Sequence, residues 1–227
     1  HWQRLARGAR ALRLPLPDAV HARREAEALL DGGDGVLKLI VTRGAGGRGY
    51  APPPQPVPHW ILSVHPLPVA PPIEGLILRW CETRLALQPA LAGLKHCNRL
   101  EQVLARGEWS DASVHEGLVR STEGDVVGAT AANLFVLRDG QWLTPPIDRC
   151  GVAGVCRSWA LAALQAAQER LAVTDVEAAE AIFLCNAVRG ILPVARLGAR
   201  SWRPHPQVVD LQRRLAAEHP AFATEVA

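Results

Sequence analysis

The sequence predicts an α+β protein with two unequal lobes. Hydrophobic residues make up 48% of the chain and charged residues 21%, which is ordinary for a globular protein. Helix-like and strand-like runs follow one another without a regular alternation, and a proline-rich stretch, HPLPVAPP, lies between two strand-like runs. We therefore expect a smaller α/β lobe at 1–64, a linker at 65–72 and a larger lobe at 73–227.

The predicted smaller lobe has two helices and two strands. Asp18, directly after Pro17, is a plausible N-cap for the second helix, and a Gly-Gly-Asp-Gly stretch ends it. The expected elements are helices at 1–13 and 19–31, a strand at 36–42, a glycine-rich loop at 43–50, an extended proline-rich segment at 51–58 and a strand at 60–64.

The predicted larger lobe begins with a strand and contains a β-meander. Glu123-Gly124 and Asp139-Gly140 are turn signals, and Asp-Gly is a strong hairpin signal. The expected elements are strands at 75–80, 116–120, 125–127, 133–138 and 182–185, and helices at 98–105, 154–172, 176–181 and 207–218.

Bulk properties disfavour several functions. No apolar run approaches the roughly 18 residues of a membrane-spanning helix, so we expect no membrane partner. The net charge is +3 with no dense basic tract, which gives nucleic-acid binding little support. The five cysteines lack a C-x-x-C spacing, so we expect neither disulfides nor a metal site, and a cytoplasmic location fits.

Lysine is rare in this chain, and only Lys38 and Lys95 occur. Lys95 follows an apolar stretch, Leu91 to Leu94. Burial disfavours a charged amine, and a neutral amine forms a Schiff base with an aldehyde. From composition alone an ordinary surface lysine is the favoured interpretation, so the sequence context must decide.

The context of Lys95 resembles a known family. Residues 93–106, GLKHCNRLEQVLAR, resemble the cofactor-lysine segment of aminodeoxychorismate lyases, which are fold-type-IV pyridoxal-phosphate (PLP) enzymes related to branched-chain and D-amino-acid aminotransferases. Five further segments agree in order and spacing: HWQRL (1–5), RGAGGRGY (43–50), AANLF (131–135), GVAGVCR (151–157) and CNAVRGILPV (185–194).

This resemblance implies PLP as cofactor, Lys95 as the Schiff-base lysine and general acid and base, and a two-lobed fold-type-IV architecture. The PLP phosphate is a dianion, and a helix N-terminus offers unpaired N–H groups to such a group. The residues expected to hold the phosphate are Arg4, Gly154, Val155, Cys156, Asn186 and Ala187. The weaker alternative for Gly154 is a plain helix-start glycine.

The implied reaction converts 4-amino-4-deoxychorismate into 4-aminobenzoate and pyruvate for folate synthesis, in a homodimer. Arg48, Tyr50 and Arg43 are the expected substrate contacts, because the substrate carries two carboxylates; Arg43 could instead be solvated. Asn98 and Arg99 could face the site or support the lysine loop. The alternatives are a fold-type-IV aminotransferase for branched-chain or D-amino acids, and a truncated or degenerate relative without activity.

Two departures from the family pattern stand out. The chain begins at His1, where the resembling enzymes have opening strands, so we expect the smaller lobe to be incomplete. The family commonly has a Glu, paired with the pyridine nitrogen, where this chain has Gly128. Thr130 or a water is the expected substitute. A lyase tolerates this loss better than an aminotransferase, because forming an aromatic ring drives pyruvate elimination.

Overall fold

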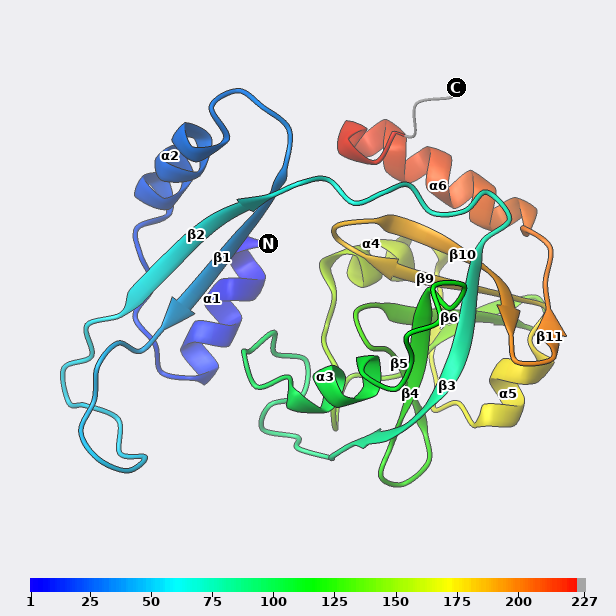
Figure 1. The fold of residues 1–227 in the computed structure, drawn as a ribbon, viewed down its shortest axis with the longest axis horizontal. Helices are drawn as coiled ribbons and strands as arrows, with labels where there is room; N and C mark the ends of the chain where they lie inside the picture. The colour runs from blue at the N-terminus through cyan, green and yellow to red at the C-terminus, as the bar shows by residue number, and fades with distance from the viewer. Residues whose placement is uncertain (224–227) are drawn as a thin grey trace. The chain divides into compact units, whose positions relative to one another are not determined.

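The computed structural model describes residues 1–223, and its ribbon is drawn in Figure 1. The chain divides into two compact units, His1–Val69 and a second that begins at Ala70. This division falls inside the proline-rich segment 65–72. Residues 224–227 of the predicted larger lobe lie outside the described residues. No helix among residues 1–223 is both long and apolar enough to cross a membrane.

The first unit consists of two helices and a two-stranded antiparallel sheet. Asp18 caps the second helix as predicted, because its Oδ1 accepts a hydrogen bond of 2.8 Å from the His21 N–H. That helix ends at Asp31, which adopts the left-handed conformation with a φ of 47°. The elements are α1 (Trp2–Ala11), α2 (Ala19–Leu30), β1 (Val36–Thr42) and β2 (His59–His65).

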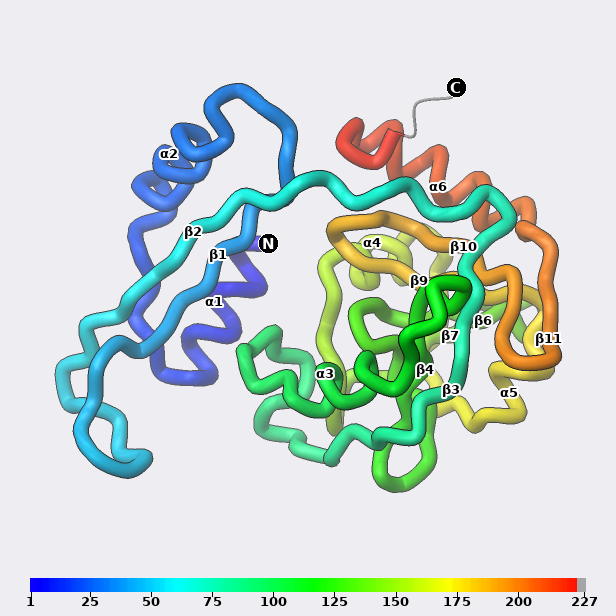
Figure 2. The backbone as a smooth tube through the Cα atoms, in the orientation of Figure 1, coloured from blue at the N-terminus to red at the C-terminus, as the bar shows by residue number. Residues whose placement is uncertain are grey.

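The second unit is built on one large sheet whose strand order is β5-β4-β3-β10-β9-β6-β7-β8, with β11 paired to β10. Figure 2 shows β10 running beside β3, with which it pairs in parallel. The strands are β3 (Leu76–Leu85), β4 (Glu116–Ser121), β5 (Val126–Ala129), β6 (Asn133–Arg138), β7 (Gln141–Thr144), β8 (Ala167–Gln168), β9 (Ala181–Asn186), β10 (Gly190–Leu197) and β11 (Arg200–Ser201). The helices are α3 (Leu100–Arg106), α4 (Val155–Leu164), α5 (Val173–Ala178), α6 (Pro206–Glu218) and the 3-10 turn η1 (Pro220–Phe222).

The central strands β6 and β9 are buried on both faces. On one face, Leu134 and Leu184 belong to the core inside the sheet. On the other face, Phe135 and Phe183 stack with ring centroids 4.7 Å apart, in a cluster that includes residues of α4 and α6. The ends of β6 and β9 are therefore fixed by packing on both sides, and they are the part of the sheet next to the candidate site.

The helix predicted at 154–172 is wrong in its second half. Helix α4 ends at Leu164, and Gln165 adopts the left-handed conformation with a φ of 50°. Residues 167–168 then pair in parallel with β7. The alanine-rich composition continues past the turn, so propensity alone gave no stop signal. The following helix was also misplaced: α5 covers Val173–Ala178 rather than 176–181.

Four strands were missed, β7, β8, β10 and β11, and β3 was predicted too short. β7 forms the second arm of the hairpin whose Asp139-Gly140 turn was predicted. β10 begins at Gly190, inside the segment 185–194 for which no strand was predicted, and the presence of Pro193 disguised it. β3 continues past Trp80 to Leu85, and its pairing with β4 shifts register between Trp80 and Arg84.

Candidate active site

The N-terminus of α4 is an anion-binding geometry. Gly154 is the N-cap residue and no side chain caps the helix. The first helical bond joins the Ser158 N–H to the Gly154 carbonyl at 3.0 Å. The N–H groups of Val155, Cys156 and Arg157 therefore have no acceptor within the helix, and the positive end of the helix dipole adds to them. This end of α4 suits a phosphate.

Gly154 leaves no room for a side chain. A Cβ built on Gly154 would overlap with Oδ1 of Asn133, the first residue of β6. The Asn133 side chain is fixed, because it is buried and its Nδ2 donates to the Val152 carbonyl at 2.9 Å. The glycine thus has a packing reason beyond starting a helix, and Asn133 is a site residue that sequence reasoning did not single out.

The segment that carries Lys95 is hydrogen-bonded to the turn before α4. The Gly93 N–H donates to the Gly151 carbonyl at 3.1 Å, and the Ala153 N–H donates to the Gly93 carbonyl at 3.1 Å. Gly93 has a φ of 78°, a conformation that favours glycine. Lys95 follows two residues later, and its side chain is exposed rather than buried in apolar surroundings. The backbone therefore brings the predicted lysine segment to the predicted phosphate turn.

Arg99 supports the lysine loop. Its Nη2 donates to the Leu94 carbonyl at 2.7 Å and its Nε donates to the His96 carbonyl at 3.2 Å. Of the two roles left open for this residue, the structure favours support of the loop. Asn98 is exposed in the same loop.

The turn between β9 and β10 contributes Asn186 and Ala187. Asn186 Oδ1 accepts from the Val188 N–H at 3.0 Å and from the Arg189 N–H at 2.8 Å. Its Nδ2 donates to the Ala131 carbonyl, just before β6. The Asn186 side chain is thus used to build the turn, and Ala187 is half-buried within it. The backbone of this turn is therefore the part that is left to contact a cofactor.

The Cys156 side chain faces the core. Cys156 is buried in the cluster under α4 and hydrogen-bonds through its thiol to Cys185 of β9. The hydrogen bond to Cys156 and burial raise the pKa of Cys185 well above its usual value. The same hydrogen bond lowers the pKa of Cys156. The Cys156 thiol is engaged with Cys185 inside the core, so only the backbone N–H of Cys156 is left for a phosphate.

Two buried donors lack partners near these segments. Nε of Arg157, in the first turn of α4, and Nε of Arg189, in the β9–β10 turn, have no hydrogen-bond partner among the described residues. Buried guanidinium donors are costly to leave unpaired. The Arg157 guanidinium is already held through Nη2, which donates to the Pro145 carbonyl at 2.9 Å and to Gln168 Oε1 at 2.8 Å.

The remaining predicted residues belong to the first unit. Arg4 lies in α1, and burial lowers the pKa of its guanidinium, with a further contribution from Arg7. Arg43 donates from Nη1 to the Arg13 carbonyl at 2.8 Å and from Nη2 to the Leu12 carbonyl, so it caps the end of α1.

Arg48 and Tyr50 lie in the loop between β1 and β2. Both side chains are exposed, and that of Tyr50 is 104% exposed.

Gly128 sits in a conformation that a side chain would strain. Its φ is +156°, and a Cβ there would lie 3.0 Å from the Ala132 carbonyl oxygen. Thr130, one expected substitute for the missing carboxylate, donates its hydroxyl to Oε1 of Glu116 on the neighbouring strand β4. A carboxylate thus lies next to this segment, but it comes from β4 rather than β5.

Metal ions have no obvious place in the described part of the chain, since no group of three or more His, Cys, Asp or Glu side chains there could hold one.

The sheet, the lysine loop and the helix N-terminus together define an enzyme fold of the type IV aminotransferase class. The sequence pattern of amino-transferase class IV matches residues 1–197. This chain belongs to the class IV aminotransferase family.

Two named relatives are lyases. Aminodeoxychorismate lyase of Vibrio harveyi is 34% identical over 95% of this chain and 84% of its own length. The crystal structure of 4-amino-4-deoxychorismate lyase from Pseudomonas aeruginosa superposes with a TM-score of 0.90, at 44% identity, over 96% of this chain and 84% of that one. The branched-chain aminotransferase of Escherichia coli has a TM-score of 0.85 at 18% identity, which shows the shared fold alone.

Members of this family depend on PLP, and PLP is the cofactor of this enzyme. The described residues fit the group. The absence of a Cβ at Gly154 lets Asn133 pack against the turn, and the amides of Val155 and Cys156 at the N-terminus of α4 suit the phosphate. Lys95 stands on a loop joined by hydrogen bonds to the same turn.

Proposed function

We propose that this chain is a carbon–oxygen lyase that converts 4-amino-4-deoxychorismate into 4-aminobenzoate and pyruvate. The observation that carries the proposal is the relationship to the Pseudomonas aeruginosa lyase, at 44% identity and a TM-score of 0.90. The Vibrio harveyi relative supports the same activity. We further propose that the enzyme is a cytoplasmic homodimer acting on a small molecule. Light scattering on the purified protein tests the dimer.

Lys95 carries the chemistry in this proposal. Bound PLP supplies an aldehyde that condenses with amines and a ring that withdraws electrons. Lys95 would hold PLP through its amine, and PLP would supply the aldehyde to which the substrate amine binds. Lys95 Nζ then takes a proton from the substrate ring and delivers a proton to the oxygen of the departing enolpyruvate. One side chain thus acts as base and then as acid.

The phosphate end of the site is proposed to be held by backbone groups. The N–H groups of Val155 and Cys156 bind phosphate oxygens at the N-terminus of α4. Asn186 and Ala187 contribute through the β9–β10 turn, and Arg4 adds a charged partner from the first unit. Such an arrangement orients the cofactor through backbone N–H groups and does not use the Cys156 side chain.

Substrate contacts are proposed for the loop of the first unit. The two carboxylates of 4-amino-4-deoxychorismate suit Arg48, whose side chain is exposed, and the hydroxyl of Tyr50. Arg43 is the weaker candidate, because its guanidinium is engaged with the carbonyls at the end of α1. An Arg48→Gln variant is therefore expected to raise KM more than an Arg43→Gln variant.

The conformation of Gly128 favours a lyase over an aminotransferase. A glutamate cannot occupy this position without moving the backbone near Ala132. Pyruvate elimination gains its driving force from the aromatic ring it forms, so it depends less on a carboxylate at the pyridine nitrogen. The aminotransferase alternative has weaker support, from a putative branched-chain-amino-acid aminotransferase of Methanocaldococcus jannaschii that is 26% identical over 80% of this chain.

The direct test is to supply the purified protein with PLP and 4-amino-4-deoxychorismate and to measure both products. We expect 4-aminobenzoate and pyruvate in equal amounts, and none with a Lys95→Ala variant. Amino-group exchange between an amino acid and a keto acid, without 4-aminobenzoate, would establish the aminotransferase alternative. Neither activity, with no PLP bound, would establish the non-catalytic alternative.

A further inference from the structure

The lysine loop depends on one side chain for its shape. Residues 94–99 belong to no helix or strand. The Arg99 guanidinium reaches back across this stretch and donates to the carbonyls of Leu94, at 2.7 Å, and His96, at 3.2 Å. These are the carbonyls on either side of Lys95. A single planar group thus holds the backbone before and after the cofactor lysine.

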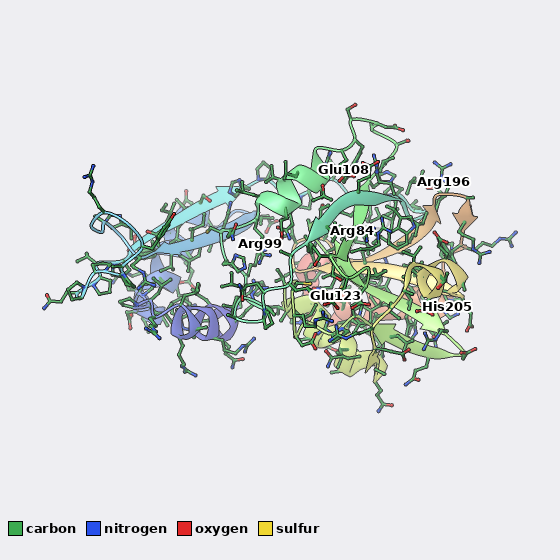
Figure 3. All side chains as sticks on the ribbon, turned by 90° about the horizontal axis from the view of Figure 1, so that it is seen from below. Arg84, Arg99, Glu108, Glu123, Arg196 and His205 are labelled. Carbon is green, nitrogen blue, oxygen red and sulfur yellow. The ribbon has the colours of Figure 1, made fainter. Side chains whose placement is uncertain are left out.

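Arg99 is itself firmly placed. It is the N-cap residue of α3, and its carbonyl accepts from the Val103 N–H at 3.0 Å. Helix α3 is fixed to the second unit by the buried Ala105 and by Glu101, whose Oε1 accepts from the Ala86 N–H at 2.8 Å. The guanidinium therefore links an anchored helix to the lysine loop through hydrogen bonds. Figure 3 labels Arg99 and Glu108, which lie beyond the two ends of α3.

The guanidinium is suited to this task in a way that an ammonium is not. Its donors are held in one rigid plane, so two carbonyls can be bound at once in a fixed relation. Arg99 is half-buried, and burial lowers its pKa, yet an arginine side chain stays charged in proteins. Hydrogen bonds from a charged donor are stronger than neutral ones, and partial burial strengthens them further.

We propose that Arg99 is a positioning residue that holds the backbone on both sides of Lys95, so that the Lys95 amine is presented to the cofactor aldehyde in one orientation. The inference rests on the proposed role of Lys95. It goes further because it assigns the loop geometry to one named side chain. Without the hydrogen bonds from Arg99, the loop samples several conformations, and only a fraction of them places the Lys95 amine where it can react with the cofactor aldehyde.

The experiment compares three variants: Arg99→Lys, Arg99→Gln and, as a matched control, Arg106→Gln. Arg106 lies at the other end of α3, and its Nη1 likewise donates to a backbone carbonyl, that of Trp109, at 3.1 Å. Each protein is mixed with PLP and a mild hydride reductant, and the rate of covalent PLP attachment to Lys95 is followed by mass spectrometry. Melting temperatures are recorded alongside.

We expect Arg99→Gln to slow attachment at Lys95 about tenfold or more, corresponding to the loss of at least one charged hydrogen bond. Arg99→Lys should recover part of the rate, because the ammonium keeps the positive charge and can still donate to one of the two carbonyls. Arg106→Gln should react like the wild type. Equal slowing by Arg106→Gln would overturn the inference, since the effect would then be general weakening of α3. If Arg99→Gln does not fold, Arg99→Lys decides: attachment at the wild-type rate overturns the inference.

The pH profile of attachment separates positioning from simple folding support. The titratable and charged groups next to the loop are His96, Cys97, Arg99 and Glu101. A nearby positive charge disfavours protonation of an amine. If Arg99 acts by positioning, Arg99→Gln should lower the rate at every pH and leave the half-maximal pH unchanged, whereas a pure charge effect would shift that pH and be fully reversed by Arg99→Lys. An unshifted profile and an unchanged rate in Arg99→Gln would overturn the inference.

Failure of the proposed function looks different. In that case the wild-type protein itself gains no PLP on Lys95, and the inference falls with the proposal. A wild-type adduct that the Arg99 variants form equally fast overturns the inference alone.

Discussion

The two halves of the candidate site are built in opposite ways. The turn before α4 rests on the buried ends of β6 and β9, and its glycine is packed so closely against Asn133 that a methyl group does not fit. The loop around Lys95 is exposed, irregular and held by the Arg99 side chain. The rigid turn before α4 is suited to binding an anion. The loop held by Arg99 presents the Lys95 amine, which must bind and release the cofactor and transfer protons.

The largest expected effect is at Gly154. Gly154→Ala places a Cβ against Asn133 Oδ1, which must shift or push the turn away. We expect a loss of about 1–3 kcal/mol in unfolding free energy and at least tenfold weaker PLP binding, measured by cofactor titration. Gly8→Ala is the control, because a Cβ there meets nothing within 4 Å. Unchanged PLP affinity in Gly154→Ala would show that the close packing of this turn does not determine cofactor binding.

A second variant sharpens that result. Asn133→Ala removes the atom that blocks position 154, so the double variant Gly154→Ala, Asn133→Ala should recover part of the PLP affinity lost in Gly154→Ala. The double variant also loses the hydrogen bond from Asn133 to Val152, so its stability stays about 1–3 kcal/mol below wild type. A double variant that binds PLP no better than Gly154→Ala would show that the steric account is wrong.

A smaller effect, on stability, is expected at Glu108, which lies beyond the end of α3 opposite to Arg99. Its carboxylate accepts from the N–H groups of Glu82 and Thr83, each at 2.8 Å, and pairs with Arg79. Burial alone would raise the pKa of Glu108, but these hydrogen bonds and the arginine lower it overall.

Because that pKa is lowered in the folded state, the stabilisation is complete above the usual carboxyl range and is lost as the pH falls through the lowered pKa. Glu108→Gln should cost about 1–2 kcal/mol near neutral pH, and its difference from wild type should shrink at acidic pH. Denaturant unfolding at several pH values measures this. A difference that does not vary with pH would contradict the assignment.

The smallest effect is expected on the surface. Arg149 pairs with Glu123, labelled in Figure 3, and more distantly with Asp125. The Glu123 side chain is 56% exposed, so solvent and salt screen the pair. Glu123→Gln should change the unfolding free energy by less than about 1 kcal/mol and should leave PLP binding unchanged. A larger effect at high salt would mean that this cluster supports the site.

Much of the fold was predictable because local signals agreed with it. Asp18 and Asp139-Gly140 act through hydrogen bonds and backbone conformations that lie within a few residues, and both were confirmed. The stop of α4 at Gln165 and the strand β10 were not predictable in the same way. Their reasons are pairings with β7 and with β3 and β9, which are remote in sequence.

The candidate site divides along the same line. Lys95 and Gly154 were singled out because short segments around them resemble a family. Asn133 acts through a contact with Val152 that only the folded chain brings together. Arg99, which the sequence already named, acts through carbonyls three and five residues away, but their geometry is visible only in the structure. Arg43 also illustrates the limit, since a glycine-rich loop gives no hint that its arginine caps a helix 30 residues earlier in the chain.

The most direct test of the account is to reduce the PLP-loaded protein with borohydride, digest it and locate the modified peptide. The account predicts a phosphopyridoxyl group on Lys95 and none on Lys38, the only other lysine. A modified Lys38, or no modified lysine after saturation with PLP, would contradict it.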